Sequence, residues 1–171
     1  MTPVAPPDTL PAMTSVAAHV TPLNLTQAVQ VDLSAAARLL DEDASTWLGS
    51  PVPAPDRGSR RFLTDLSLPL RDHVVAVTFK KAAFVDLSNL RAGSGRCEVD
   101  ISWRSSSLAP LFPVFAGKLT LTRSELRLDG FYAPPGGDVG AVLDKAFLNI
   151  AARGTARWFL GKIAEALAEP A

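Results

Sequence analysis

The sequence contains little cysteine, histidine or tyrosine and no long hydrophobic run, and each absence excludes or disfavours a class of protein. One cysteine among 171 residues excludes an intrachain disulfide and a zinc site built on cysteine pairs, and two histidines disfavour a histidine-based metal site. No run approaches the roughly 20 apolar residues that cross a bilayer. Because 17 basic residues balance 17 acidic ones, no net charge attracts nucleic acid or acidic lipid. We therefore expect a cytoplasmic protein that binds neither nucleic acid nor metal and has no integral membrane segment.

Composition and the distribution of proline predict one domain preceded by an arm. Hydrophobic residues make up 47% of the chain and charged residues 20%, which is typical of a soluble globular domain. Five prolines lie within the first 22 residues, where they remove backbone donors and disfavour a regular element. We expect a flexible, Pro-rich N-terminal arm over residues 1–22 and a single domain over residues 23–171.

Apolar and polar residues alternate with a period of two through most of residues 23–133, which predicts strands with one buried face. The clearest strand covers residues 96–104, where every second residue of 97–103 is apolar. Short turns separate the strands, which favours a meandering antiparallel sheet over βαβ units. The other predicted strands lie at 23–32, 62–68, 75–79, 82–87, 115–122 and 126–132, the last two pairing as a hairpin.

Helices are expected near both ends of this sheet. Ser34 precedes an Ala- and Leu-rich run and is expected to cap a short helix, which should fray at the acidic residues 41–43. A second helical turn is expected at Ala44–Leu48, followed by a Pro- and Gly-rich surface loop over residues 49–58. Residues 139–167 contain no proline and predict one long amphipathic helix of about 45 Å.

Several residues carry a family resemblance in addition to this order of elements. They are the strand-to-helix junction with Val29, Val31 and Ser34, Trp47 after an acidic turn, the run 111–132 that ends in the Gly-Phe-Tyr-Ala-Pro-Pro-Gly turn at 130–136, and the following helix with Thr155 and Arg157. With them the chain resembles uncharacterised bacterial members of the SRPBCC superfamily, also called Bet v 1-like, START-like or polyketide cyclase-like. The resemblance implies the α+β helix-grip fold, in which a seven-stranded curved antiparallel sheet wraps around a long C-terminal helix. It also implies a cavity between sheet and helix, used across the superfamily for lipids, sterols, polyketides and other apolar molecules.

The candidate site is this cavity, and no catalytic constellation is visible around it. The inward-facing aromatic side chains that could line it are also typical of an ordinary core, because aromatic residues bury large areas in any protein. Tyr132 is the polar group that could orient a ligand, provided that no bulge at Gly130 turns it outward. Cys97 is expected to be a buried, unreactive thiol. The inward-facing residues expected to line the cavity are Phe62, Phe79, Trp103, Phe115, Tyr132, Phe147 and Ile150.

Three functions remain open at this point. The leading hypothesis is binding of a small hydrophobic molecule, such as a lipid or polyketide, without a cofactor and without catalytic residues. A pocket enzyme of the cyclase or dehydratase type would require an ionisable group in the cavity, for which Asp129, His73 and Arg127 are candidates. A protein-interaction module with a filled cavity would be indicated by an exposed Trp158 or Phe159 on the helix. The sequence predicts neither the identity of the ligand nor an oligomeric state.

Overall fold

The computed structural model describes residues 20–71, 76–107, 114–133 and 145–168. Within these ranges the fold is α+β, with a seven-stranded curved antiparallel sheet and a long C-terminal helix, as the sequence predicts. The elements are β1 (Thr21–Ala28), α1 (Leu33–Asp41), α2 (Ala44–Leu48), β2 (Ser50–Val52), β3 (Ser59–Arg71), β4 (Ala76–Ala92), β5 (Cys97–Ser105), β6 (Val114–Leu121), β7 (Glu125–Ala133) and α3 (Lys145–Ala168).

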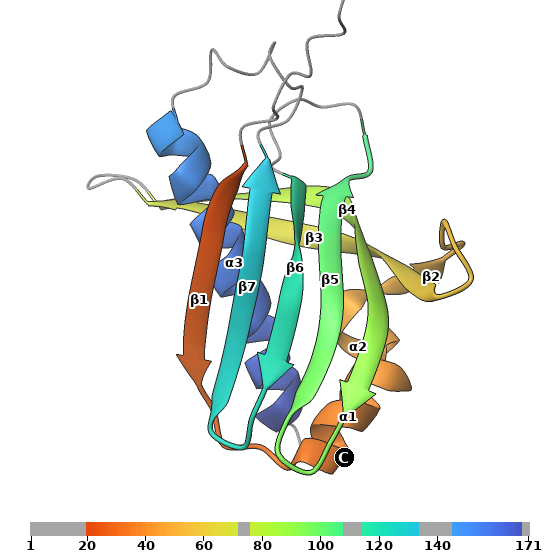
Figure 1. Ribbon diagram of the computed structural model, residues 1–171. Helices are drawn as coiled ribbons and strands as arrows, with labels where there is room; N and C mark the ends of the chain where they lie inside the picture. The colour runs from red at the N-terminus through yellow and green to blue at the C-terminus, as the bar shows by residue number, and fades with distance from the viewer. Residues whose placement is uncertain (1–19, 72–75, 108–113, 134–144, 169–171) are drawn as a thin grey trace, which may run out of the picture.

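The strands form one sheet in the order β1-β7-β6-β5-β4-β3-β2, and every neighbouring pair is antiparallel. Each strand from β2 onward pairs with the next strand in sequence, whereas β1 pairs with β7 and adds the far edge. Figure 1 shows α3 behind β1, β7, β6 and β5, with β3 crossing at a steep angle to them. Helix α3 contacts β1 and β7 at one end of the strand order and β3 near the other end. The curved sheet therefore wraps around the helix.

The hydrophobic core lies between the concave face of the sheet and α3. Every second residue of β5, from position 97 to position 103, is buried, as the alternation predicts. The inner faces of β4, β6 and β7 follow the same period of two. From the helix, Ala152, Ala156 and Ile163 belong to the same core cluster. Small alanine side chains let the helix backbone approach the sheet closely.

The observed and predicted sheets both have seven strands, but the bounds of two predicted elements differ from those observed. Strand β2 lies in the segment predicted as a loop, and the two strands predicted at 75–79 and 82–87 are parts of one strand, β4. Strand β4 continues through Lys80 and Lys81 because backbone ladder hydrogen bonds do not require apolar side chains. Pro51 is compatible with β2 because β2 is an edge strand, where a missing donor leaves no ladder bond unmade.

The N-cap of α1 differs from the prediction, and its C-terminal end has a contact that the sequence did not predict. Asp32, not Ser34, is the N-cap, and its carboxylate accepts hydrogen bonds from the backbone N–H groups of the first turn at 2.9 and 3.0 Å. At the other end, the guanidinium of Arg60 in β3 donates to the carbonyl oxygens of Leu40 and Asp41. The helix ends at Asp41, within the acidic segment where the sequence predicts its end, and a cation from the sheet satisfies its last carbonyls. Whether these residues fray stays a prediction.

Two predicted segments, the N-terminal arm and the C-terminal helix, extend beyond the described residues. Strand β1 begins at Thr21, two residues inside the predicted arm, and residues 1–19 of that arm lie outside the described part. Helix α3 covers the predicted C-terminal helix from Lys145 onward, and residues 139–144 of that prediction also lie outside it. None of the helices in the described ranges is long and apolar enough to cross a membrane.

Candidate functional site

One row of directly paired residues crosses five neighbouring strands on the concave face. Cross-strand pairing places Phe62 opposite Val85, Val85 opposite Trp103, Trp103 opposite Phe115, and Phe115 opposite Tyr132. All five side chains are at most 5% exposed. The register between β6 and β7 is continuous through Gly130, so no bulge is present and Tyr132 faces inward. Four of the predicted lining residues therefore lie in a single line across the sheet.

Aromatic contacts join this row to both α3 and α2. The rings of Trp103 and Phe115 are stacked, with centroids 4.2 Å apart and an interplanar angle of 20°. Trp103 also contacts Phe159 of α3 at 5.4 Å, and Phe159 contacts Trp47 of α2 edge to face at 5.5 Å. Offset and edge-to-face aromatic pairs stabilise a core beyond their buried area. This continuous aromatic chain fixes where the helices sit on the sheet.

Three buried polar atoms on the inner side have no hydrogen-bond partner within the described part of the chain. They are Trp103 Nε1, the Tyr132 hydroxyl and the hydroxyl of Thr155 in α3. Thr155 is fully buried, and the other two residues are nearly so. Buried polar groups are normally satisfied, and an unsatisfied one costs roughly 1–3 kcal/mol. The interior between the sheet and α3 therefore contains three buried polar groups that make no hydrogen bond to the described residues.

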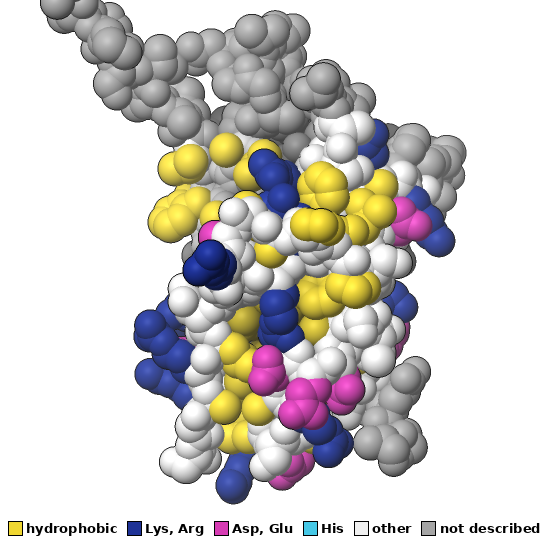
Figure 2. Space-filling view, turned by 90° about the vertical axis from the view of Figure 1, so that its right-hand side faces the viewer, with side chains coloured by type: hydrophobic (Ala, Val, Ile, Leu, Met, Phe, Trp, Pro, Cys, Tyr) yellow, Lys and Arg dark blue, Asp and Glu magenta, His cyan; other side chains and the backbone are white. Residues whose placement is uncertain are grey.

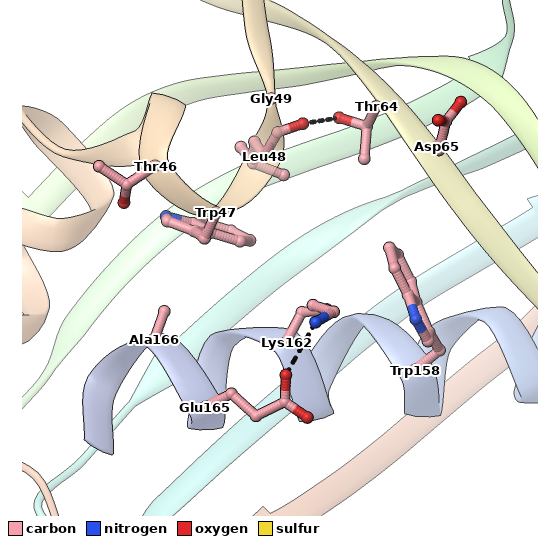
Figure 3. A pocket seen from close by; sticks show the side chains of 10 residues that line it. All are labelled: Thr46, Trp47, Leu48, Gly49, Thr64, Asp65, Trp158, Lys162, Glu165 and Ala166. Atoms are coloured by element: carbon pink, nitrogen blue, oxygen red, sulfur yellow. Dashed lines mark hydrogen bonds and ion pairs between the residues drawn. The ribbon is translucent and has the colours of Figure 1, made fainter. Parts of the chain in front are cut away.

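An open pocket of about 400 Å³ lies beside this interior, where α2 and β3 face the C-terminal half of α3. Figure 3 shows Trp47 reaching it from α2 and Trp158 from α3, with Leu48 and Thr64 above and Lys162 and Glu165 below. We call it the tryptophan pocket. Its lining residues are Thr46, Trp47, Leu48, Gly49, Thr64, Asp65, Trp158, Lys162, Glu165 and Ala166.

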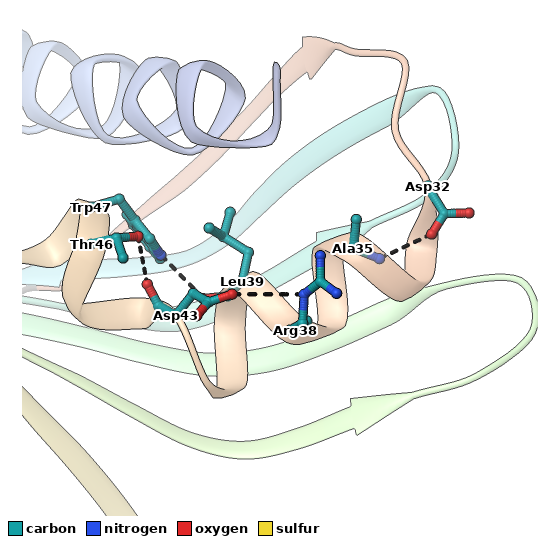
Figure 4. Close-up of polar contacts among 7 residues, drawn as sticks. All are labelled: Asp32, Ala35, Arg38, Leu39, Asp43, Thr46 and Trp47. Atoms are coloured by element: carbon teal, nitrogen blue, oxygen red, sulfur yellow. Dashed lines mark hydrogen bonds and ion pairs between the residues drawn. The ribbon is translucent and has the colours of Figure 1, made fainter. Parts of the chain in front are cut away.

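The short helix α2 holds Trp47 in a defined orientation. Figure 4 shows the indole N–H of Trp47 donating to the carbonyl oxygen of Leu39 in α1, at 3.3 Å. The hydroxyl of Thr46 donates to the carbonyl oxygen of Asp43 at 2.7 Å, which closes the first turn of α2. The indole ring of Trp47 also contacts the ring of Phe159, so Trp47 is held by both α1 and α3. A rigid wall of this kind loses little entropy when a ligand contacts it.

Helix α3 forms the opposite wall of the tryptophan pocket with side chains that lie on one face of the helix. Trp158, Lys162 and Glu165 are spaced four and then three residues apart, which places them on one face of α3. The ammonium of Lys162 lies 2.8 Å from a carboxylate oxygen of Glu165, so the two charges of this wall neutralise each other. The pocket therefore presents two indoles and a paired charge, together with the carboxylate of Asp65.

The turn from α2 into β2 requires glycine. Gly49 has φ +103, and a Cβ there would come within 2.6 Å of the carbonyl oxygen of Leu63. The hydroxyl of Thr64 donates to the carbonyl oxygen of Leu48, which ties the end of α2 to β3. The edge of the tryptophan pocket formed by these residues is thus held by backbone geometry.

Not all of the predicted lining residues can be placed. The side chains of Phe79 in β4 and Phe147 in α3 lie outside the described part of the structure. Ile150, which was expected to face the sheet, is instead 54% exposed. It lies seven residues before the exposed Arg157, on the same helix face, and the buried face of α3 is the opposite one. Whether Phe62, Trp103, Phe115 and Tyr132 contact a ligand stays a prediction.

The sequence did not single out most of the pocket's lining. The sequence places Trp47 after an acidic turn and Trp158 on the C-terminal helix, but it gives no indication that Thr64, Lys162 and Glu165 share a site with them. The helical spacing from Trp158 to Lys162 and Glu165 is a signal that could have grouped them. The place of Thr64 in the pocket could not be predicted from the sequence, because only tertiary packing brings β3 against α3.

The other chemical candidates are placed away from the pocket or are outside the described residues. Cys97 is buried in the core, and burial, together with the nearby charge of Glu98, raises the pKa of its thiol. Arg127 and Asp129 pair with each other at 2.6 Å and do not line the pocket. His19 and His73 fall outside the described residues. No cluster of metal-ligating side chains is present in the described ranges.

Charges on the surface are mixed rather than segregated. Figure 2 shows basic and acidic side chains interspersed on one face of the molecule, with apolar side chains between them. Phe159 is buried and Trp158 is only partly exposed, so the helix does not present both as an outer apolar patch. This arrangement does not favour the hypothesis that the helix is the contact surface of a protein-interaction module.

Comparison with known proteins gives a fold relationship only. No family model and no curated protein matches the chain. A conserved protein from Geobacillus kaustophilus has a similar structure, with a TM-score of 0.51 and 12% identity over 86% of this chain and 95% of that chain. Hypothetical protein jhp0584 from Helicobacter pylori aligns over 98% of this chain and 99% of its own, with 7% identity and a TM-score of 0.44. The first of these supports the architecture of an antiparallel sheet with a C-terminal helix and nothing finer.

Proposed function

We propose that the protein binds a small, largely apolar molecule in the tryptophan pocket, between the sheet and α3. The observation that supports this most directly is the pocket's volume of about 400 Å³ together with its two indole walls. Ligand pockets usually measure roughly 300–1,000 Å³ and are lined mainly by apolar and aromatic groups with a few polar ones. Trp47, Leu48 and Trp158 supply the apolar walls, whereas five of the ten lining residues carry polar or charged side chains, so the ligand is expected to present some polar groups as well.

Burial of apolar ligand surface would be the main driving force. Covering about 250 Å² of ligand surface contributes about 6 kcal/mol at about 25 cal/mol per Å². Part of this is offset by the loss of translational and rotational freedom, so we expect a weak dissociation constant of about 0.1–1 mM for burial alone. The Lys162–Glu165 pair at the rim has no net charge, and Asp65 adds one carboxylate to the lining, so the pocket disfavours an anionic ligand.

We further infer that the chain belongs to the SRPBCC superfamily of helix-grip proteins. The sheet order, the two short helices after β1 and the long C-terminal helix support this inference. The likeness to the Geobacillus kaustophilus protein supports the architecture on which it depends. Binding of apolar molecules, such as lipids or polyketides, is consistent with that membership.

A pocket-filling variant tests the proposed function. N-phenyl-naphthylamine, a neutral apolar fluorophore, should bind the wild-type protein saturably and gain fluorescence as it leaves water. Ala166→Trp should abolish this signal because Ala166 lines the pocket and a larger side chain there would occupy it. Phe131→Ala is the matched control, since Phe131 is 57% exposed and does not line the pocket. No saturable binding by the wild type, or equal binding by Ala166→Trp, would overturn the proposal.

A further inference from the structure

The end of helix α1 is held by side chains from two other elements. The carbonyl oxygen of Arg38 accepts hydrogen bonds from the backbone N–H groups of Glu42 and Asp43, which close the last turn of the helix. The three carbonyl oxygens that follow, those of residues 39–41, all accept side-chain donors. The last carbonyls of a helix have no partner within the helix, so each of these donors satisfies a group that would otherwise be free.

Arg60 supplies donors to two of these carbonyls from the sheet. Its guanidinium donates to the carbonyl oxygens of Leu40 and Asp41 and lies 3.3 Å from the carboxylate of Asp41. A guanidinium presents its N–H groups in a rigid plane, and hydrogen bonds from a charged donor are stronger than neutral ones. Arg60 pairs with Leu87 of β4, so its backbone belongs to the sheet ladder. Arg60 therefore ties the end of α1 to a fixed point of the sheet.

Trp47 donates to the third carbonyl and so depends on the same turn. Its indole N–H binds the carbonyl oxygen of Leu39, which directly precedes the two carbonyls that Arg60 binds. Helix α2 has only five residues, and a helix of this length is not stable without contacts to the rest of the protein. Two residues separate α2 from α1. The position of the last turn of α1 thus determines where the indole of Trp47 meets its acceptor.

Arg60 acts on the tryptophan pocket from outside it, because Trp47 lines the pocket and Arg60 does not. We propose that Arg60 is a positioning residue of the tryptophan pocket. It fixes the last turn of α1, so that the carbonyl oxygen of Leu39 holds the indole of Trp47 in place as a wall of the pocket. The effect of Arg60 on ligand binding rests on the proposed function, whereas its effect on Trp47 requires no ligand.

The first measurement therefore follows Trp47 in the protein without ligand. Hydrogen exchange of the indole N–H groups of Trp47 and Trp103 is measured in ¹⁵N-edited spectra of the wild type and Arg60→Gln. Trp103 is 1% exposed, so its exchange rate gives the contribution of global unfolding, which is subtracted from the rate at Trp47. We expect the remaining rate at Trp47 to be at least about fivefold faster in Arg60→Gln, the factor that corresponds to the loss of one hydrogen bond. A loss of global stability alone would not change this remaining rate.

Two further variants complete the comparison. Arg60→Lys keeps the charge but not the planar pair of donors, so its exchange rate at Trp47 should lie between those of the wild type and Arg60→Gln. It also provides the comparison if Arg60→Gln does not fold. Arg96→Gln is the matched control, because Arg96 is an exposed arginine paired with Glu98 and does not line the pocket. Arg96→Gln should keep the wild-type rate.

The second measurement is the dissociation constant of N-phenyl-naphthylamine in the same proteins. It should rise at least about threefold in Arg60→Gln, the factor expected if Trp47 forms the wall for only a third of the time. Arg96→Gln should bind like the wild type.

The outcomes separate this inference from the proposed function. An unchanged remaining exchange rate at Trp47 in Arg60→Gln would overturn the inference, and so would faster exchange with an unchanged dissociation constant. If N-phenyl-naphthylamine does not bind the wild type, the proposed function fails. Faster exchange at Trp47 in Arg60→Gln would still support the positioning of Trp47 by Arg60 in that case.

Discussion

The ring of Phe115 lies against Gly130 of the neighbouring strand, so closely that a Cβ on Gly130 would come within 2.7 Å of Phe115 Cζ. Gly117 pairs with Gly130 across β6 and β7, and a Cβ on Gly117 would meet the same ring atom at 2.7 Å. Two glycines on the inner face thus leave room for the Phe115 ring, which in turn stacks on Trp103. The aromatic row that borders the candidate site depends on this pair of missing side chains.

Gly130→Ala should therefore destabilise the fold. The new methyl group would also lie within 2.4 Å of the carbonyl oxygen of Ala116, which belongs to the backbone and cannot swing away. We expect a loss of about 2 kcal/mol in the free energy of unfolding, measured by urea titration. Gly161→Ala is the control, because a Cβ at Gly161 in α3 meets nothing within 4 Å. It should stabilise the protein by about 0.5–1 kcal/mol, and equal effects of the two substitutions would contradict the packing described.

The Arg61–Asp86 pair should contribute measurably to stability. The guanidinium of Arg61 donates to both carboxylate oxygens of Asp86, at 2.6 and 2.8 Å, and the two side chains are only 11% and 18% exposed. Asp86→Ala should cost about 2 kcal/mol, because it leaves a largely buried guanidinium without its acceptor. Asp43→Ala breaks the exposed pair with Arg38 and should cost about 0.5 kcal/mol or less. A similar cost for both substitutions in urea titrations would argue against the burial of the first pair.

The N-cap Asp32 should give the protein a component of acid sensitivity. The backbone N–H of Ala35, followed by that of Ser34, holds the pKa of the Asp32 carboxyl below its ordinary value. Since the pKa is lower in the folded state, the stabilisation is present above the unfolded value of about 3.9 and is lost as the pH falls through the folded value. Asp32→Asn keeps an oxygen acceptor but cannot titrate. The difference in unfolding free energy between wild type and Asp32→Asn should be constant above about pH 5 and change below about pH 4. A difference that stays constant throughout would contradict this role.

The thiol of Cys97 should be unreactive in the folded protein. It is buried on the inner face of β5, and burial raises its pKa, so little thiolate forms and reagents cannot reach it. In native protein at about pH 8, we expect a chromogenic disulfide reagent to modify the thiol only as fast as the protein unfolds. In denaturant the reaction should be complete within the mixing time of a manual experiment. Fast stoichiometric reaction of the native protein would place Cys97 in an accessible site instead.

The inner face of the sheet could be predicted from sequence because strand alternation is a local signal. Each residue of a strand points to the opposite side from its neighbour, so the pattern around Cys97 and Trp103 identifies their common face without knowledge of the partner strands. Register is not local in this sense. That Trp103 lies opposite Phe115, and Phe115 opposite Tyr132, depends on turn geometry and pairing that the alternation does not encode.

The differences between the predicted and the observed structure have identifiable physical causes. Lys80 and Lys81 interrupt the apolar pattern of β4 but not its backbone hydrogen bonds, so one strand looked like two. The helical spacing of Val142, Ala146 and Ile150 predicts that Ile150 belongs to the buried stripe, yet its position two turns before Arg157 puts it on the exposed face. The tryptophan pocket joins Trp47 to Trp158, which are more than a hundred residues apart in sequence. Periodicity within either helix could not show that these two side chains face one space.

The indole N–H signals of the three tryptophans test the central claim most directly. In ¹⁵N-edited spectra of the wild type, assigned with single Trp→Phe variants, ethylnaphthalene should shift the signals of Trp47 and Trp158 saturably. The same titration of Ala166→Trp should leave both signals in place, because the pocket is filled. If neither signal moves in the wild type, or if both move equally in Ala166→Trp, the tryptophan pocket is not a binding site for apolar molecules.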